Sequence, residues 1–407
     1  MTLFFEILIA IIIGTLCGII TGIAPGIHVN LIVTLVVGSS GILLKYTTPE
    51  ILCIFIIALS VTHIFLEFIP STFLGAPDAS TILSVLPGHR YLLAGNGMMA
   101  VKLSCIGCFF GILMSALLVY PTIKLIPAIY PFIKEYMVFF LMIIIGLMVL
   151  QNTKKAWAIV VFLCAGVLGV VVLQYSTVKE PLFPMLTGLF GTATLILSMN
   201  EISNIPEQYQ TEQIAIDKKT AIKALCSGQC SAVVMALFPA LSPAIAALFG
   251  MQLTKNIGDH GYMILQGCIN SAGFIVSIMT LYTIEKARNG AVAGIHEITM
   301  SLGKTELLLF IITAIVAAAV AVPIAFWFGR VFAEYVPRIP YRKLSMTICG
   351  IIILLTIILS SWQGLLVLIT ATAIGIIPGI VKVTRTMAMG CLLVPTLVYY
   401  VGIAGIG

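Results

Sequence analysis

Long apolar runs, separated by short polar breaks, extend along almost the whole chain. They predict helical segments over residues 3–23, 29–44, 51–69, 98–120, 136–151, 156–174, 182–199, 221–238, 240–250, 262–284, 305–328, 344–361, 363–377 and 386–405. A helix needs about 20 apolar residues to cross a bilayer, and many of these runs approach or reach that length. The pattern predicts an all-α polytopic membrane protein with roughly 10–14 transmembrane or re-entrant helices.

The composition supports this interpretation. Of the 407 residues, 60% are hydrophobic and only 9% are charged, whereas a soluble domain carries about 25% charged residues. The longest polar interval, near residues 200–220, is too short for a soluble domain. The net charge of +6 suits loops beside anionic membrane lipids. No basic cluster is dense enough to predict a nucleic-acid partner.

The sequence carries no motif of an enzyme active site. A nucleotide-binding loop, a G-x-S-x-G elbow and an H-E-x-x-H zinc motif are all absent from it. Cys105 and Cys108 form a C-x-x-C, but no second pair lies at zinc spacing, so helix packing is the plainer interpretation. We therefore predict no enzymatic activity and no metal site, and no cofactor beyond H⁺ or Na⁺ as a coupling ion.

Several spacings indicate an internal duplication. Gly14 precedes Pro25 by eleven positions, and Gly228 precedes Pro239 by the same interval. An A-x-N-G-x-x-A pattern occurs at residues 94–100 and again at 287–293. Duplicated halves are common among secondary transporters. We predict a first transmembrane repeat over residues 1–200, a polar linker over 201–220 and a second repeat over 221–407.

The first break in the apolar pattern spans residues 22–28, Gly-Ile-Ala-Pro-Gly-Ile-His. Pro25 and Gly26 disfavour a continuous helix, and a break frees backbone groups at membrane depth. A membrane protein tolerates such groups only where they are buried in protein or line a polar cavity. Broken helices therefore point to a transporter's binding site. His28 and Asn30 offer polar groups just after the break, although a freed carbonyl would also satisfy the histidine.

The second break begins at Gly75 with Gly-Ala-Pro-Asp-Ala-Ser-Thr and ends with Pro-Gly at residues 87–88. Pro77 suits the first position of a helix, whose N-terminus presents free N–H groups and favours an anion. Residues 79–86 would rise only about 12 Å as a helix, so we predict a re-entrant hairpin. Asp78 either occupies the anion site itself or binds a coupling cation or a proton. A purely structural hairpin, capped by its own side chains, is the alternative.

The second half offers weaker counterparts. Ser242 lies in the segment 239–243, which lacks the glycine and histidine of the first break. Asn270 and Ser271 are polar residues inside an apolar run, and they either bind a ligand or hydrogen-bond a neighbouring helix. Lys286 and Arg288 either attract an anion at a cavity mouth or belong to a solvated loop.

Glu67 is the main candidate for ion coupling within a membrane helix. An ionisable residue inside a membrane is a functional hypothesis by default. His63 lies four residues earlier and so shares a helix face with it. Because Glu67 is near Pro70 at the end of its run, an interfacial position is the alternative.

The segment 75–97 and the Gly22–Gly26 break resemble the signature of the tripartite tricarboxylate transporter large permease family, the TctA-like proteins. In that family a Pro-rich loop of small residues precedes a D-G-Y-P stretch, and a G-x-x-P-G element lies near the N-terminus. Residues 280–290 depart from the family's second-half T-L-G-I-P-G-S, which is consistent with a divergent, archaeal branch.

The resemblance implies a secondary transporter of di- or tricarboxylates with two homologous halves. It also implies a small membrane subunit and an extracytoplasmic binding protein as partners. Membrane lipids surround such a protein, and a homodimer is compatible with it. The basic loops near residues 154–155, 330–343 and 382–385 predict a cytoplasmic side in a prokaryotic cytoplasmic membrane.

We therefore predict uptake of an organic anion, coupled to a proton or sodium gradient. A translocase of a lipid-linked anion such as a polyprenyl phosphate is the alternative, and a non-transporting scaffold or receptor is a third class. The predicted ion-coupling residues are Glu67 and Asp78. The predicted substrate-binding residues are Pro25, Gly26, His28, Asn30, Ser71, Thr72, Gly75, Ala76, Pro77, Asp78, Ser80, Thr81, Ser242, Asn270 and Ser271.

Overall fold

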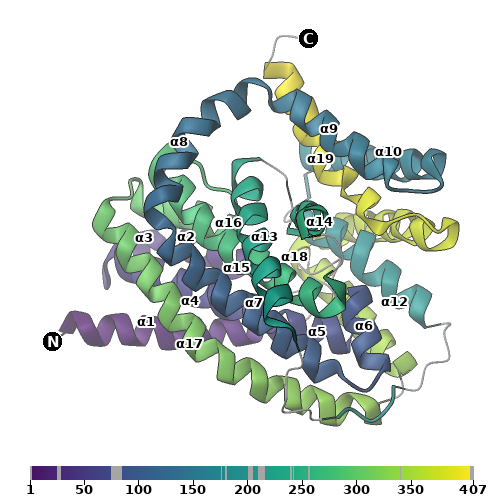
Figure 1. The fold of residues 1–407 in the computed structure, drawn as a ribbon, viewed down its shortest axis with the longest axis horizontal. Coiled ribbons are helices and arrows are strands. Elements are labelled where there is room, and N and C mark those ends of the chain that lie inside the picture. Colours follow the sequence, from purple (N-terminus) through teal and green to yellow (C-terminus); the bar gives the residue numbers. More distant parts are fainter. Residues whose placement is uncertain are drawn as a thin grey trace.

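In the computed structural model, all the secondary structure of the part of the chain that it describes is helical (Figure 1). That part comprises residues 2–24, 29–74, 85–175, 177–178, 181–199, 205–209, 216–238, 241, 243–254, 257–339 and 341–403. The α-helices before residue 200 are α1 (Thr2–Ile23), α2 (Val29–Gly38), α3 (Ser40–Leu43), α4 (Pro49–Leu66), α5 (Phe68–Phe73), α6 (Val85–Leu93), α7 (Gly97–Leu117), α8 (Val119–Glu135), α9 (Met137–Leu150), α10 (Lys155–Val170), α11 (Leu182–Leu186) and α12 (Ala193–Ser198).

The later α-helices are α13 (Lys218–Leu237), α14 (Pro243–Thr254), α15 (Gly258–Ile284), α16 (Gly290–Thr299), α17 (Lys304–Tyr335), α18 (Tyr341–Val381) and α19 (Gly390–Ile403). Two π-helical segments, η2 (Val171–Tyr175) and η3 (Thr187–Thr192), extend α10 and join α11 to α12. Two short 3₁₀ turns, η4 (Val336–Arg338) and η5 (Arg385–Met389), follow α17 and precede α19.

Eight of the described helical segments are long and apolar enough to cross a membrane. They are Leu3–Ile23, Pro49–Phe73, Gly97–Leu117, Lys155–Gln174, Lys218–Leu237, Gly258–Ile284, Lys304–Arg338 and Ser345–Val381. The pair α8 and α9, bent by 83°, makes a ninth if it is one broken span. The predicted polytopic helical fold is therefore confirmed.

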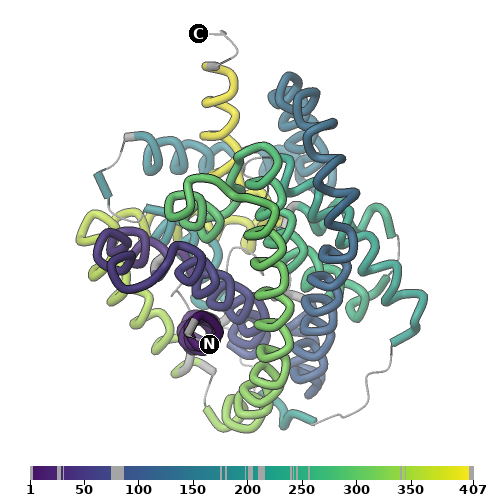
Figure 2. Tube along the Cα trace, turned by 90° about the vertical axis from the view of Figure 1, so that its left-hand side faces the viewer, coloured from purple at the N-terminus to yellow at the C-terminus, as the bar shows by residue number. Residues whose placement is uncertain are grey.

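The helix α15 forms the centre of the bundle. All of its most apolar window is buried, whereas only 28% of the corresponding window of α1 is buried. The helices α7 and α13 pack along α15, and α17 packs against α4 and α7. In Figure 2, α17 crosses the near face of the molecule and α1 is seen end-on. Polar side chains carried by α15 are thus shielded from lipid by the surrounding helices.

Glycines set the closest helix contacts of this core. At Gly107 of α7 an added Cβ would lie 2.1 Å from the Ile264 carbonyl oxygen of α15. At Gly14 of α1 it would lie 2.5 Å from the Phe55 carbonyl oxygen of α4. Small residues allow such close approach of backbones, and packing of this kind drives helix association in membranes. The glycines therefore fix how α7 lies on α15 and how α1 lies on α4.

The packing of the two predicted halves follows a related scheme. Within the first half α1 packs on α4, and within the second half α13 packs on α15. Between the halves, α7 packs on α15 and α17 packs on α4. Asn96 and Asn289 of the repeated pattern are both N-cap residues, but they begin helices of 21 and 10 residues. The division into repeats over 1–200 and 221–407, with the linker 201–220, stays a prediction.

Helix ends flank both breaks in the first half. The break predicted over residues 22–28 begins later than expected, because α1 continues through Gly22 and ends at Ile23. The helix α2 begins at Val29, and residues 25–28 lie outside the described residues. The short helices α5 and α6 pack against each other on either side of the undescribed residues 75–84. At Gly88 of α6 an added Cβ would lie 3.2 Å from Thr72 Oγ1 of α5. The packing of α5 on α6 agrees with the predicted re-entrant hairpin, but residues 75–84 lie outside the described residues, so the hairpin stays a prediction.

The second arm of this hairpin contacts the beginning of α15. Arg90 Nε donates a hydrogen bond of 2.8 Å to Asp259 Oδ2, and this bond raises the pKa of the Arg90 guanidinium. The two side chains are 60% and 39% exposed. The Tyr91 hydroxyl lies 2.8 Å from His260 Nδ1 and is more protected from solvent.

We expect Arg90→Ala to lower the free energy of unfolding by less than about 1 kcal/mol, because exposed ion pairs are screened by solvent. The measurement is thermal or denaturant unfolding in detergent. Arg338→Ala, which removes the comparably exposed pair with Glu334, is the matched control. A loss several times larger at Arg90 than at Arg338 would contradict this estimate and make the pair a structural anchor of the hairpin.

Candidate functional site

Glu67 lies at the junction of α4 and α5, in the interior of the bundle. Pro70 has no N–H to donate to the Leu66 carbonyl, so the regular helical pattern is interrupted at this junction. Glu67 is both the C-cap of α4 and the N-cap of α5, and it is only 4% exposed. A carboxyl group buried in a membrane bundle is costly unless it is hydrogen-bonded or shares a proton.

A row of donors on α15 leads to this carboxyl group. Asn270 Nδ2 donates a hydrogen bond of 2.7 Å to Glu67 Oε1. Gln266 Nε2 donates to Asn270 Oδ1 at 3.2 Å, and the Tyr262 hydroxyl donates to Gln266 Oε1 at 3.4 Å. The three donors are four residues apart, so they share one face over about 12 Å of helix. Each of these side chains donates its hydrogen bond in the direction of Glu67. The bond from Asn270 fixes the position of the Glu67 carboxyl group.

His63 approaches Glu67 from the other side. Its Nε2 lies 3.5 Å from Glu67 Oε2, and its Nδ1 lies 3.1 Å from Thr21 Oγ1 of α1. Because the Thr21 hydroxyl donates to the Gly18 carbonyl at 3.2 Å, its oxygen accepts from His63 Nδ1–H. Nε2 then faces Oε2, so an imidazole and a carboxyl group lie side by side in the buried core.

Glu67 lies beside the middle of α15. Its partner Asn270 is near the centre of that 27-residue helix. The predicted shared face of His63 and Glu67 is confirmed, while the depth of Glu67 in the membrane stays a prediction. We call Thr21, His63, Glu67, Asn270, Gln266 and Tyr262 the core network. It joins α1 and α4 of the first predicted half to α15 of the second.

The predicted residues near the core network have different surroundings. Ser71 and Thr72 are each 1% exposed in α5, and Ser71 is four residues after Glu67. Ser71 Oγ is buried and makes no hydrogen bond to any described residue. Asn270 bonds a neighbouring helix through Glu67, while Ser271 Oγ donates to the Cys268 carbonyl of its own helix at 3.3 Å. Asn30 contacts Gly290 at the beginning of α16.

The remaining predicted site residues lie outside the described residues, so they stay predictions. They are Pro25, Gly26, His28, Gly75, Ala76, Pro77, Asp78, Ser80, Thr81 and Ser242.

Sequence reasoning missed three members of the core network and one buried cation. Tyr262, Gln266 and Asn270 form a polar stripe with a period of four in an apolar helix, which is a readable signal. Thr21 has no comparable signal, because isolated threonines are common in membrane helices. Lys102, 7% exposed in α7, is a further buried charge.

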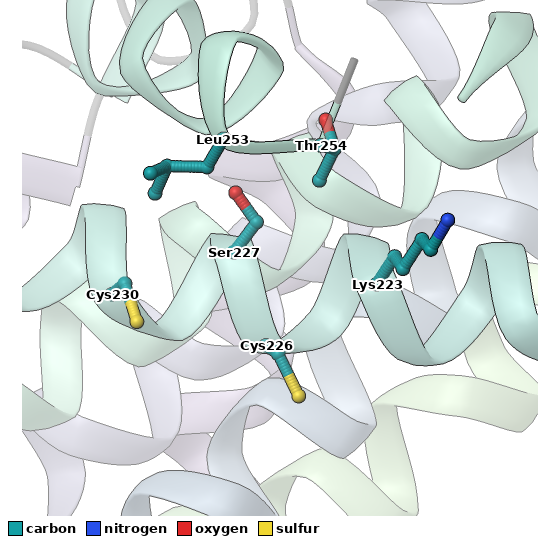
Figure 3. Close-up of a pocket in the computed structure, with 6 residues that line it drawn as sticks. All are labelled: Lys223, Cys226, Ser227, Cys230, Leu253 and Thr254. Carbon is teal, nitrogen blue, oxygen red and sulfur yellow. The ribbon is translucent and has the colours of Figure 1, made fainter. Parts of the chain in front are cut away.

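A separate surface pocket of about 360 Å³ lies between α13 and α14 (Figure 3). Its walls are Lys223, Cys226, Ser227, Cys230, Leu253 and Thr254. The hydroxyls of Ser227 and Thr254 both donate to the Gly250 carbonyl, at 2.8 and 2.9 Å. No member of the core network lines it. In the described part of the chain, no three His, Cys, Asp or Glu side chains gather as a metal site.

The chain was compared with known proteins. A family model described as "Tripartite tricarboxylate transporter TctA family" matches residues 8–390. A curated relative, "Uncharacterized protein MJ1079" of Methanocaldococcus jannaschii, is 27% identical over 379 residues, which cover 90% of this chain and 92% of the relative. No solved structure matches the chain.

Proposed function

The chain belongs to the tripartite tricarboxylate transporter TctA family, and from this premise we propose that it is a secondary active transporter of an organic anion, coupled to proton entry. As a member of this family with eight apolar helices, it is a multi-pass membrane protein and a transporter component. The substrate that we propose is a di- or tricarboxylate.

One observation carries the choice of the proton as coupling ion. His63 Nε2 and Glu67 Oε2 lie 3.5 Å apart in the buried core, and the role that we propose for this pair is to take up and release a proton. A sodium ion at Glu67 would have to displace or repel the imidazole. The His63–Glu67 pair connects α4 to α1 through Thr21 and to α15 through Asn270, so a change in its protonation acts on three helices at once.

Coupling requires that proton and substrate favour the same conformation of the protein. We propose that the carboxylate groups of the substrate bind at the broken helices around residues 25–28 and 75–81. The buried hydroxyl of Ser71, close in sequence to Glu67 and to the second break, is available to the substrate or to the proton path. Helix N-termini at these breaks would favour the anion.

The name of the family implies a system of three components. We propose that a small membrane subunit and an extracytoplasmic binding protein work with this chain. The binding protein would deliver the carboxylate to the outward-facing cavity. Uptake assays should therefore include the partner subunits if these are encoded with this chain. If they are not, the assays need a high substrate concentration.

The test is uptake of labelled citrate, succinate and malate into proteoliposomes under an imposed pH gradient or an imposed sodium gradient. We expect the pH gradient to drive carboxylate accumulation. Uptake should fall at least about tenfold in Asp78→Asn and in Pro77→Ala, which corresponds to the loss of one charge-assisted or helix-end interaction. Unchanged uptake in both variants would remove the proposed anion site. Accumulation driven only by sodium would replace the proton as coupling ion.

A further inference from the structure

Arg288 is a partly buried cation in the connection between α15 and α16, at the opposite end of α15 from the hairpin contact of Arg90. The backbone around it is well fixed. Its N–H donates to Ser277 Oγ at 3.2 Å, and Thr280 Oγ1 donates to the Lys286 carbonyl at 3.0 Å. The α15 helix ends at Glu285 in the left-handed conformation, with φ 52°. The position of the Arg288 side chain is therefore built into the fold and does not depend on a solvated loop.

The guanidinium of Arg288 contacts three other elements. Its Nη2 donates to the carbonyl of Leu237, the last residue of α13, at 3.2 Å. Its central carbon lies 5.3 Å from the ring centroid of Tyr130 in α8, a cation–π distance. The Tyr400 side chain of α19 also lies close to it. These contacts orient the guanidinium, but all three come from neutral groups.

The charge of Arg288 lacks compensation in the described part of the chain. Arg288 forms no ion pair with any described carboxylate, and its buried Nε donor has no acceptor among the described residues. A buried donor left without an acceptor and a buried charge left without a counter-charge are both costly. The arrangement gains free energy when an anion binds.

Arg288 also lies near described residues that flank the breaks predicted in the two halves. Leu237, which it contacts, lies two residues before the second-half segment 239–243. Two residues after Arg288, an added Cβ on Gly290 would lie 2.4 Å from Oδ1 of Asn30, which follows the first break. One cation thus adjoins the edges of both breaks.

We propose that Arg288 binds a carboxylate group of the transported solute, at a subsite beside the end of α13 and the beginning of α16. This proposal rests on the proposed anion transport. The Nε–H, which has no acceptor among the described residues, belongs to the same planar guanidinium as the Nη donors, and paired donors of this kind match two carboxylate oxygens. The subsite selects for a planar carboxylate, and a lysine at position 288 would supply the charge without the paired donors.

The test compares four proteins in detergent: the wild type, Arg288→Gln, Arg288→Lys and Lys286→Gln. Lys286 carries the same charge two residues away in the same connection but is exposed, so it is the matched control. The readout is the rise in unfolding temperature with citrate, with inorganic phosphate, and with a short-chain phosphatidic acid, against sodium chloride at equal ionic strength. The unfolding temperature without added anion reports whether each variant is folded.

We expect citrate to stabilise the wild type and Lys286→Gln alike. In Arg288→Gln the half-saturating citrate concentration should rise at least about tenfold, as expected for loss of a charge-assisted bidentate contact. Arg288→Lys should have a half-saturating citrate concentration between those of the wild type and Arg288→Gln. It should also remain folded if Arg288→Gln does not.

Three outcomes would overturn the proposal, and they are distinguishable. Equal citrate stabilisation of the wild type and both Arg288 variants removes the subsite but leaves carboxylate transport intact. Stabilisation by phosphatidic acid alone assigns the cation to a lipid-linked anion. A wild type that no anion stabilises, and that takes up no carboxylate in proteoliposomes, removes the proposed function together with the subsite.

Discussion

Glu67→Gln should abolish accumulation of the substrate under a pH gradient while the protein still exchanges labelled for unlabelled substrate. Glutamine keeps the size of the side chain, and its oxygen still accepts from Asn270 Nδ2. It cannot gain or lose a proton beside His63 Nε2, so the link between proton and substrate is lost. The expected loss of gradient-driven uptake is on the order of 100-fold, near the upper range of measured coupling free energies.

Two assays on the same proteoliposomes measure this effect. Net uptake under an imposed pH gradient reports coupling, and counterflow without a gradient reports substrate binding and the conformational change. Glu50→Gln, in the first turn of the same helix α4, is the matched control and should leave both rates unchanged. If Glu67→Gln accumulated substrate as well as the wild type, the coupling role of the core network would be wrong. Loss of counterflow as well would place Glu67 in substrate binding instead.

The core network shows which part of a membrane site can be predicted from sequence. The shared face of His63 and Glu67 follows from their spacing of four, and that prediction is confirmed. The hydrogen bond from Asn270 to Glu67 joins residues 203 positions apart. It depends on how α15 lies against α4, which no local pattern specifies. Asn270 on its own was therefore equally consistent with a ligand contact and with a helix contact.

One helix break could be predicted from the sequence. The predicted gap between residues 361 and 363 corresponds to Ser361, where φ is 60° and α18 bends.

The surroundings of a charged side chain could not be predicted in this way. Arg288 and Lys286 are two residues apart and look equivalent in sequence. Only the packing of α8, α13 and α19 against the connection makes Arg288 partly buried and leaves Lys286 exposed. Tertiary context, more than residue type, separates a candidate binding cation from a solvated one.

A large effect on stability is expected at Gly267, in the contact between α15 and α7. An added Cβ there would lie 2.2 Å from the Ser104 carbonyl oxygen and 3.1 Å from Cys108 N. Both atoms belong to the backbone, so no side-chain rotation relieves the overlap. Gly267→Ala must push the two helices apart, and we expect it to lower the free energy of unfolding by about 2–3 kcal/mol, as overpacking typically does.

Gly146 in α9 provides the matched control for this substitution. No atom lies within 4 Å of a Cβ added there. Because alanine favours a helix over glycine, Gly146→Ala should leave stability unchanged or raise it by up to about 1 kcal/mol. Thermal unfolding in detergent compares the two variants. Equal stability of Gly267→Ala and the wild type would mean that α7 and α15 do not pack as closely as the structure places them.

The same substitution also tests how the core network is positioned. Asn270 is three residues after Gly267, less than one helical turn, so a displaced α15 carries Asn270 away from Glu67. In Gly267→Ala protein that remains folded, gradient-driven uptake should therefore fall more than counterflow, as in Glu67→Gln but to a smaller extent. An equal fall in both rates would show that the contact of α7 with α15 supports the fold without positioning Glu67. Close helix packing and ion coupling would then be separate properties of this bundle.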